Sequence, residues 1–324
     1  MRVCLTGGTG FIGQALVKRL LGHGAQVRVL ARTSPRADAL ASQGVEIVSG
    51  DVAEAEAIRR AVEGSEIIIH AAAMVEGRGS RQKFFDANVR GTDSVLQASL
   101  RAQARRIIYL SSIAVYGPLR DDEWIDEDTP FDLLPEERDF YAQSKIEADR
   151  LALKFAKHSP VPLTILRPGI VFGPGRPLPT ALLGARVSTV DIVFGRPNQP
   201  FPLTYLENLV DAIELAGREP ASDSRQYIVL DDERLTLGHY HAARTAITKT
   251  KSIFCSAQPI VMAATITHPL ARLLPADAGA FSRRQMIRAS EDRYYSTRRI
   301  REELNWKPKI SLEEAIERTS RNIP

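Results

Sequence analysis

Three glycines near the start of the chain restrict its fold more than any other feature. They stand at positions 7, 10 and 13, after an apolar run with the pattern of a strand, Arg2–Thr6, and at the beginning of a helical pattern, Gly10–Leu20. In such a strand–turn–helix unit, Gly7 would form the tight turn and Gly10 would let the backbone approach a pyrophosphate. Gly13 would let the helix pack closely on the sheet, and the helix N-terminus would present free N–H groups to phosphate. The segment predicts a dinucleotide site; a tight turn without a ligand is the alternative.

The first half of the chain alternates between short β-branched runs and helical patterns. Further strands are predicted at Val27–Leu30, Glu46–Val48, Ile67–His70, Ile107–Leu110 and Leu163–Arg167. Further helices are predicted at Glu54–Val62, Phe84–Arg101 and Tyr141–His158. This alternation indicates an α/β fold of the Rossmann type, a doubly wound parallel sheet with helices on both faces and right-handed crossovers.

After about residue 171 the pattern becomes irregular. Proline and glycine are dense in 173–179 and again in 195–200, which predicts loops of a smaller lobe. We therefore expect a dinucleotide-binding domain over 1–170, to which 203–220 returns. Residues 171–202 and 221–324 would form the smaller, irregular C-terminal lobe that binds the substrate.

The charge of the chain argues against nucleic acid as a partner. Its 43 Lys and Arg residues against 39 Asp and Glu residues leave a net charge of +4 over 324 residues, which is a weak field. The densest basic clusters are separate in sequence and have no aromatic residues between their members. They are Arg105-Arg106, Arg283-Arg284 and Arg298-Arg299-Arg301.

The cysteines and the apolar runs bear on the compartment. There are 2 cysteines, too few for a disulfide framework, and Cys4 sits in an apolar run, so we expect a reducing compartment. No signal-peptide pattern precedes the first strand. The longest apolar stretch, Pro259–Leu274, is interrupted by polar residues and predicts a buried or hinge helix rather than a membrane span. We expect a cytoplasmic protein with no transmembrane segment.

The end of the second predicted strand bears on the choice of dinucleotide. An acidic residue there would bind a ribose 2′-hydroxyl, whereas a basic one would accept a 2′-phosphate. The chain has Arg32, with Arg36 nearby, which favours NADP. NAD is the alternative, since Arg32 could instead stack on the adenine. Asp51, after the third strand, could accept from the adenine amino group or simply cap the next helix.

Tyr141 and Lys145 are candidates for acid–base chemistry. They stand four residues apart in a predicted helix, so they share one face. A neighbouring cation favours the phenolate, and such a tyrosine can exchange a proton with a carbinol oxygen. Ser111 and Ser112 follow a predicted buried strand, at the edge of an open sheet where ligands bind.

His70 ends an apolar strand and is interpreted as a core histidine. No cluster of His, Cys, Asp and Glu has metal-ligand spacing.

These segments together resemble the extended short-chain dehydrogenase/reductase superfamily, in its NAD-dependent epimerase/dehydratase group. The resemblance covers nearly the whole chain. It is carried by the glycine loop, Gly50-Asp51, His70–Ala73, Asn88–Thr92, Ser111–Gly117, Tyr141–Lys145, Leu166–Gly175 and Leu304–Pro308.

The resemblance implies roles for individual residues. Tyr141 would be the general acid/base, Lys145 would lower its pKa and bind the nicotinamide ribose, and Ser112 would orient the reacting oxygen. The implied cofactor contacts are Gly7, Thr9, Gly10, Phe11, Ile12, Gly13, Arg32, Asp51, Val52, Ala71, Ala72, Ala73, Asn88, Ser111, Tyr141, Lys145, Pro168 and Ile170. The implied substrate contacts are Ser112, Tyr116 and Gly169. The helices over Phe84–Arg101 and Tyr141–His158 would form a homodimer interface, as is common in the superfamily.

One position and two short segments indicate to which branch of the superfamily the chain is most similar. Ile170 stands where sugar-nucleotide enzymes usually carry an Asn, and Tyr205-Leu206-Glu207-Asn208 is similar to the 3β-hydroxysteroid dehydrogenase and dihydroflavonol reductase branch. An apolar pocket without sugar contacts favours an NAD(P)-dependent oxidoreductase acting on a secondary alcohol or ketone. Val115-Tyr116-Gly117 is frequent among sugar enzymes, so a sugar-nucleotide epimerase or dehydratase with tightly bound NAD stays open. A non-catalytic dinucleotide-sensing or scaffold protein is the third possibility.

Overall fold

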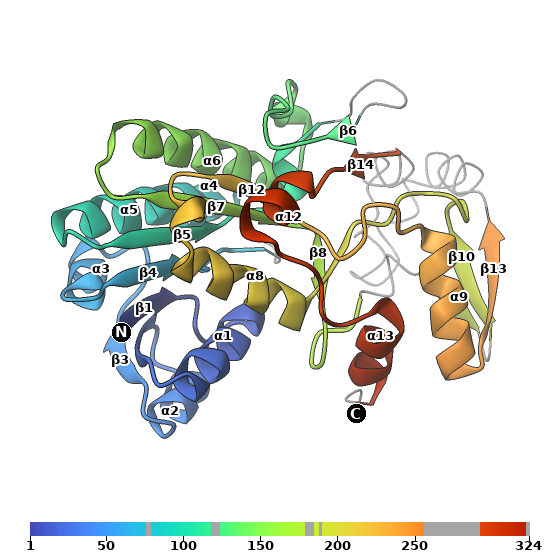
Figure 1. Cartoon of the computed structure of the whole chain (residues 1–324), viewed down its shortest axis with the longest axis horizontal. Coiled ribbons are helices and arrows are strands. Elements are labelled where there is room, and N and C mark those ends of the chain that lie inside the picture. Colours follow the sequence, from blue (N-terminus) through green and yellow to red (C-terminus); the bar gives the residue numbers. More distant parts are fainter. Residues whose placement is uncertain (76–78, 118–123, 179–184, 188–189, 256–291, 322–324) are drawn as a thin grey trace.

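A seven-stranded parallel sheet forms the centre of the molecule (Figure 1). The computed structural model describes residues 1–75, 79–117, 124–178, 185–187, 190–255 and 292–321. The strand order is β12-β7-β5-β4-β1-β2-β3. The strands are β1 (Arg2–Thr6), β2 (Gln26–Ala31), β3 (Glu46–Ser49), β4 (Ile67–His70), β5 (Arg106–Leu110), β7 (Leu163–Pro168) and β12 (Gln226–Val229). The predicted doubly wound Rossmann-type α/β fold is confirmed.

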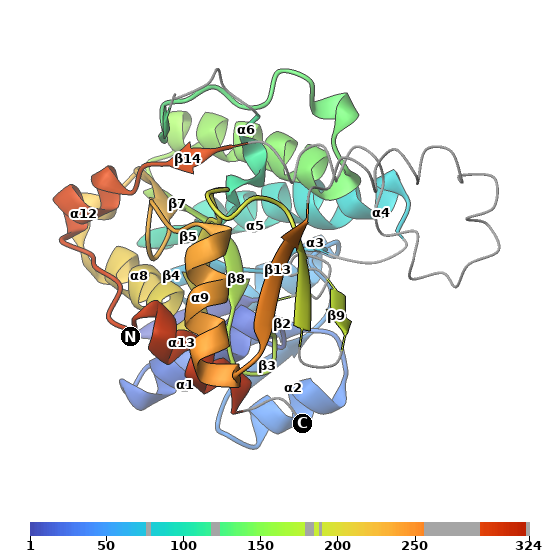
Figure 2. The same cartoon turned by 90° about the vertical axis from the view of Figure 1, so that its right-hand side faces the viewer.

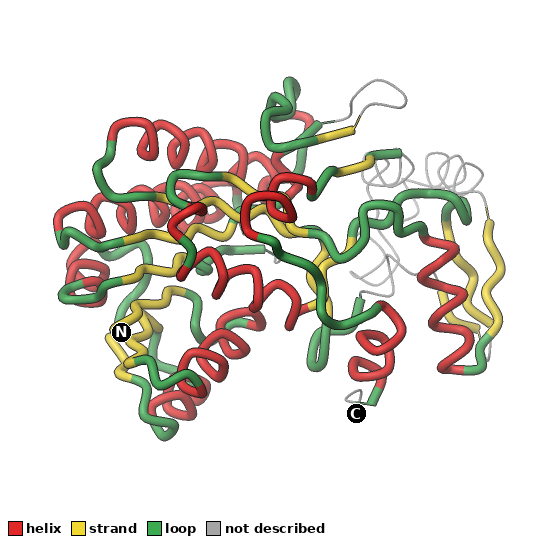
Figure 3. Tube along the Cα trace, viewed as in Figure 1, coloured by secondary structure: helices red, strands yellow, loops and turns green. Residues whose placement is uncertain are grey.

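Helices cover both faces of the sheet (Figure 3). Because successive side chains of a strand point to opposite faces, Val3 and Leu5 of β1 join one core and Cys4 joins the other. The first core is shared with α1 (Phe11–Gly22), α2 (Pro35–Ala41) and α8 (Leu206–Arg218). The second core is shared with α3 (Ala55–Val62), α5 (Gly91–Arg101) and α6 (Phe140–His158).

The single helix predicted over Phe84–Arg101 is interrupted. The structure has α4 (Arg81–Phe85), one π-helical turn (Asp86–Arg90) and then α5. The turn is centred on Asn88, whose buried side chain is bonded to backbone outside the helix. A single π turn of this kind is often found at a functional site.

The smaller lobe contains a three-stranded sheet, β13-β10-β9, beside α9 (Leu237–Thr248) and α13 (Leu312–Ser320) (Figure 2). Its strands are β9 (Ala185–Val187), β10 (Val190–Phe194) and β13 (Lys251–Cys255). Two short pairs complete the described strands: β8 (Ile170–Phe172) with β11 (Leu203–Tyr205), and β6 (Trp124–Ile125) with β14 (Tyr294–Tyr295).

The chain returns to the main sheet after residue 202. Leu203–Tyr205 pairs with β8 outside this sheet, and α8, which follows, packs against α1 in the first core. In 221–324, expected in the smaller lobe, the structure differs: β12 pairs with β7, and α12 (Arg298–Leu304) buries Ile300 and Leu304 in the first core. β12 supplies the backbone hydrogen bonds that β7 would otherwise lack at its outer edge. No helix among the described residues is long and apolar enough to cross a membrane; Pro259–Leu274 lies outside them.

Candidate active site

The glycine loop lies between β1 and α1, against the end of β4. Gly7 has φ +78°, and a Cβ on it would lie 2.6 Å from the backbone nitrogen of Ala72. A Cβ on Gly13 would lie 2.1 Å from the carbonyl oxygen of Gly7, so only glycine allows the observed packing. The roles predicted for Gly7 and Gly13 in the turn and in helix packing therefore have a direct steric cause.

The N-terminus of α1 is open for an anion. Gly10 precedes the helix, and no side chain caps its first turn. The first-turn N–H groups and the positive end of the helix dipole therefore remain available for phosphate, which fits a dinucleotide. Thr9, Phe11 and Ile12, the other predicted contacts of this loop, surround that turn in sequence.

Ala71, Ala72 and Ala73 continue β4 at its carboxyl end, and all are half-buried. Ala71 N–H donates to the Thr6 carbonyl (3.2 Å), and Ala72 N–H donates to Thr6 Oγ1 (3.3 Å). Their small side chains and this tethering keep the segment close to the glycine loop.

His70 is a core histidine, as predicted. Its Nδ1 lies 2.7 Å from Thr6 Oγ1 and its Nε2 lies 3.0 Å from Thr92 Oγ1. Because Thr92 donates its own proton to the Asn88 carbonyl (2.6 Å), Nε2 is the protonated nitrogen and Nδ1 accepts from Thr6. Complete burial lowers the pKa of His70 to about 3. The neutral ring is a structural link rather than a base.

Arg32 and Asp51 face each other across the ends of β2 and β3. Arg32 Nε lies 3.6 Å from Asp51 Oδ2, and the Arg32 side chain is 82% exposed. Asp51 Oδ1 also accepts from Ala53 N–H (3.0 Å), while the neighbouring Val52 packs on Gly91. Arg32 is thus accessible to a phosphate but already has an anionic neighbour in the protein.

Ser111, Ser112 and Tyr141 lie where β5 ends and α6 begins. Ser111 is the first residue after β5 and is buried. Ser112 Oγ accepts from Ala114 N–H (3.1 Å) and so caps the 3-10 turn Ile113–Val115. Burial raises the pKa of Tyr141 to about 12, and the neighbouring Ser112 hydroxyl acts in the opposite direction. The hydroxyl groups of Ser112 and Tyr141 therefore lie near each other at this edge of the sheet.

Lys145 is almost completely buried, with 2% of its surface exposed. Its Nζ donates to the Leu110 carbonyl (2.8 Å) and to the Tyr109 hydroxyl (3.5 Å), and it lies 5.0 Å from the centre of the Tyr109 ring. Burial lowers the pKa of Lys145 to about 8, and the charge of Asp149 opposes this effect.

The expected lowering of the Tyr141 pKa by Lys145 is not produced by the chain on its own. Desolvation of the phenol is the larger effect, and the ammonium is held by Leu110 and Tyr109. At neutral pH the free protein therefore carries Tyr141 as the phenol.

Asn88 is fully buried and spans the site. Its Oδ1 accepts from Met74 N–H (2.7 Å), while its Nδ2 donates to the Met74 carbonyl and to Ser144 Oγ, both at 2.9 Å. It ties the segment after β4 to α6.

Tyr116 does not reach an open surface, contrary to its predicted contact with substrate. It is 0% exposed, and its hydroxyl accepts from Arg167 (2.7 Å). Arg167 also donates from Nε to Asp149 Oδ2 (2.8 Å), and both side chains of this ion pair are 0% exposed. Asp149 was missed by the sequence reasoning. Its position four residues after Lys145, on the same helical face, was the available signal.

Pro168, Gly169 and Ile170 connect β7 to β8. Pro168 is buried and Ile170 is half-buried. Gly169 N–H donates to Thr204 Oγ1 (3.0 Å), and a Cβ on Gly169 would lie 2.4 Å from the Pro202 carbonyl oxygen. Gly169, a predicted substrate contact, is therefore required by close backbone packing.

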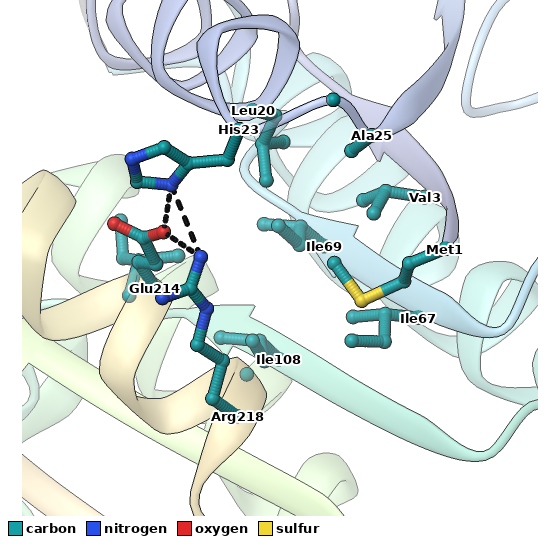
Figure 4. Close-up of a pocket in the computed structure, with 13 residues that line it drawn as sticks. Met1, Val3, Leu20, His23, Ala25, Ile67, Ile69, Ile108, Glu214 and Arg218 are labelled. Atoms are coloured by element: carbon teal, nitrogen blue, oxygen red, sulfur yellow. Dashed lines mark hydrogen bonds and ion pairs between the residues drawn. The ribbon is translucent and has the colours of Figure 1, made fainter.

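A cavity of about 80 Å³ lies at the opposite, amino end of the strands (Figure 4). It is lined by aliphatic residues of β1, β4, β5 and α8, with His23, Glu214 and Arg218 at its rim. It is smaller than ordinary ligand sites, which occupy about 300 Å³ or more. Within the described ranges, no group of three His, Cys, Asp or Glu residues could hold a metal ion.

Comparison with known proteins agrees with this geometry. Residues 3–229 match the family described as NAD dependent epimerase/dehydratase family. The chain is 28% identical to 2-alkyl-3-oxoalkanoate reductase of Shewanella oneidensis over 72% of this chain and 62% of that protein. It is 29% identical to 3 beta-hydroxysteroid dehydrogenase/Delta 5-->4-isomerase of Mycobacterium tuberculosis, over 73% and 66%. The matched part covers less than two thirds of each relative.

Among solved structures, UDP-glucose 4-epimerase of Thermotoga maritima with UDP-glucose superposes with a TM-score of 0.76 at 19% identity. The match covers 99% of this chain and 98% of that chain, and it demonstrates a common fold. Together with the family match and the hydroxysteroid dehydrogenase relative, it confirms the resemblance that the motifs indicated. The chain belongs to the NAD-dependent epimerase/dehydratase family of extended short-chain dehydrogenases/reductases.

Proposed function

We propose that this protein is an NAD(P)-dependent oxidoreductase that interconverts a secondary alcohol and a ketone on a largely apolar small molecule. The observation that carries the proposal is the proximity of the buried Tyr141 phenol to the Ser112 hydroxyl, which lowers the pKa of Tyr141, with Lys145 buried one helical turn away. With two hydroxyl groups close together, a single substrate oxygen could contact both.

The dinucleotide supplies or accepts the hydride at the carbinol carbon when it is bound. In ketone reduction, the neutral phenol of Tyr141 donates its proton to the substrate oxygen as negative charge develops there. Ser112 donates a second hydrogen bond to the same oxygen and fixes its position. In alcohol oxidation Tyr141 must first release its own proton to solvent, and the resulting phenolate accepts the proton of the substrate hydroxyl, so one residue serves both directions.

The proposed substrate class is supported by Ile170 and by the names of two relatives. Ile170 is an aliphatic side chain where a sugar-binding amide would be needed, and it is half-buried beside the buried Pro168. The two curated relatives are named for a 3-oxoalkanoate and a 3β-hydroxysteroid, both oxygenated carbon skeletons. A largely apolar ketone or alcohol agrees with both.

We propose NADP as the cofactor, with NAD as the alternative. The exposed Arg32 guanidinium at the end of β2 suits a 2′-phosphate. Asp51 lies near enough to compete with that phosphate for Arg32 or to accept a hydrogen bond from the adenosine. The preference for NADP or NAD then depends on whether Arg32 binds the 2′-phosphate or stays paired with Asp51.

A second candidate is a sugar-nucleotide epimerase or dehydratase with tightly bound NAD. The family description and Val115-Tyr116-Gly117 favour it. Engagement of the Tyr116 hydroxyl by Arg167 weighs against Tyr116 as a sugar contact. The third candidate, a non-catalytic dinucleotide-binding protein, would have no use for the Tyr141–Ser112 pair.

One experiment separates these candidates. The purified protein is analysed for bound cofactor and then assayed with NADPH or NADH on panels of apolar ketones and of UDP-sugars. Net oxidation of the cofactor with an alcohol product supports the proposal, whereas an isomerised sugar without net oxidation supports the second candidate. The Tyr141→Phe variant should lose at least about a hundredfold in kcat. Full activity in this variant would refute the mechanism.

We also propose a homodimer through α5 and α6. A groove between these helices is lined by Leu100, Leu151 and Phe155 together with polar residues, and it has a volume of about 450 Å³. Light scattering during gel filtration would detect the dimer. Replacing the half-buried Leu151 with Glu should shift the protein to a monomer.

A further inference from the structure

Three buried charges lie together beneath the candidate site. Lys145 and Asp149 are one turn apart on α6, and Arg167 reaches Asp149 from β7. Their exposed fractions are 2%, 0% and 0%, respectively. Ions are strongly destabilised in such surroundings unless an opposite charge lies nearby, so the cluster needs a reason to exist.

The contacts of the three side chains are unequal. Each of the three guanidinium nitrogens of Arg167 has a partner: Asp149 Oδ2 (2.8 Å), the Tyr116 hydroxyl (2.7 Å) and Gln226 Oε1 (2.8 Å). Asp149 uses only Oδ2, and its Oδ1 is buried without a hydrogen-bond partner among the described residues. A carboxylate that needed only to satisfy Arg167 could use both oxygens in a bidentate pair.

The groups that face Lys145 come from four elements. Tyr109 of β5 and His70 of β4 are neutral, and Tyr141 on α6 is a phenol. Arg167 on β7 is a cation. The charged residues of α4, the π turn, the start of α5 and the turn before α6 are all at least partly exposed: Arg81, Lys83, Asp86, Arg90, Asp93, Glu136, Glu137, Arg138 and Asp139. Of the buried carboxylates in the described ranges, Asp149 is the one whose charge acts on Lys145.

We propose that Asp149 is a positioning residue that keeps the buried Lys145 protonated, with Arg167 anchoring the carboxylate in place. The consequence is that Lys145 keeps all three N–H groups. Two are used by Leu110 and Tyr109, and the third remains for the bound cofactor. Only the contact of the third N–H group with a bound cofactor rests on the proposed function.

Lysine titration by NMR tests the inference without substrate or cofactor. The protein, with its nine lysines, is labelled with ¹³C at lysine Cε, and the Lys145 signal is assigned by its loss in Lys145→Met. In the unmodified protein the Lys145 midpoint should lie near 8, below those of the exposed lysines. Asp149→Asn should lower this midpoint by about one pH unit or more, and Asp149→Glu should restore part of the shift.

Glu147→Gln is the matched control. It makes the same carboxylate-to-amide change on the same helix, but the Glu147 side chain is 50% exposed and should leave the Lys145 midpoint in place. If Asp149→Asn leaves Arg167 unpaired and does not fold, Asp149→Asn/Arg167→Met removes both charges. Its Lys145 midpoint should lie below that of the wild type, because the buried carboxylate is gone.

A Lys145 midpoint that equals the wild-type value in folded Asp149→Asn, or in the double variant, would overturn the inference. Failure of the proposed function is recognised by a different measurement. Full activity of Tyr141→Phe would refute the proposed function, but it would not affect the conclusion from the Lys145 titration in the Asp149 variants. If Asp149→Asn lowers the Lys145 midpoint, the alkaline limb of the pH profile of kcat/KM should move to lower pH by the same amount. A purely packing role for Asp149 would reduce activity at every pH without moving that limb.

Discussion

Asn88 Nδ2 lies 2.9 Å from Ser144 Oγ and thereby joins a π-helical turn to the helix that carries Tyr141 and Lys145. The same amide group brackets the backbone of Met74 with two more hydrogen bonds. One buried side chain therefore sets the spacing between the segment after β4 and α6.

Asn88→Ala should destabilise the fold and weaken dinucleotide binding. It leaves Met74 N–H without its partner, and a buried unsatisfied group costs about 1–3 kcal/mol. Chemical denaturation and calorimetric titration with NADPH measure the two effects. Asn198→Ala, at an exposed position, is the control and should change neither. A stable Asn88→Ala variant with unchanged affinity would show that the brace is dispensable.

Two glycines of α1 should respond in opposite directions to alanine. Gly13→Ala places a Cβ 2.1 Å from the Gly7 carbonyl, so the glycine loop must move, and both stability and dinucleotide affinity should fall sharply. Gly22 lies on the same helix, and a Cβ on it would have no atom of the described residues within 4 Å. Gly22→Ala should raise the free energy of unfolding by up to about 1 kcal/mol, because alanine favours the helix. Thermal unfolding and nucleotide titration of both variants check this contrast.

Arg32→Asp should weaken NADP binding more than NAD binding. The substitution removes a cation from a 2′-phosphate and adds a second carboxylate beside Asp51. Dissociation constants for both cofactors are measured at one ionic strength. Arg105→Asp, at an exposed position before β5 at the opposite end of the sheet, serves as a charge-matched control. Equal losses for both cofactors in Arg32→Asp would contradict the phosphate assignment.

Asp231 should make the protein less stable as the pH rises from about 4 to 7. Burial raises its pKa from 3.8 to about 7, so over this range the folded state binds more protons than the unfolded state. The free energy of unfolding then decreases with increasing pH. Asp231→Asn keeps an oxygen for Tyr205 N–H, which donates to Asp231 at 2.7 Å, and should remove this dependence. Denaturation curves from pH 4 to 8, with Asp38→Asn at an exposed position of α2 as control, measure it.

The periodicity of the chain is enough to predict most of the main sheet. Short β-branched runs that alternate with helical patterns indicate buried strands, and the glycines at 7 and 13 require a close β1–α1 crossing. Six of the seven strands of the main sheet follow from these local patterns, and so does the helix that places Tyr141 and Lys145 on one face. Local patterns suffice here because strands that are covered by helices on both faces have short continuous apolar sequences.

The electrostatics of the site depend on contacts that no local pattern contains. Arg167 meets Asp149 across 18 residues, and Tyr116 reaches Arg167 across 51, so their burial and pairing arise only when β7 packs on α6. Desolvation, which holds Tyr141 as a phenol and lowers the pKa of Lys145, is likewise a property of the assembled core. The order of residues along the chain was enough to specify which chemical groups meet at the edge of the sheet. Their charge states came from long-range packing, because they depend on which neighbours replace water around each group.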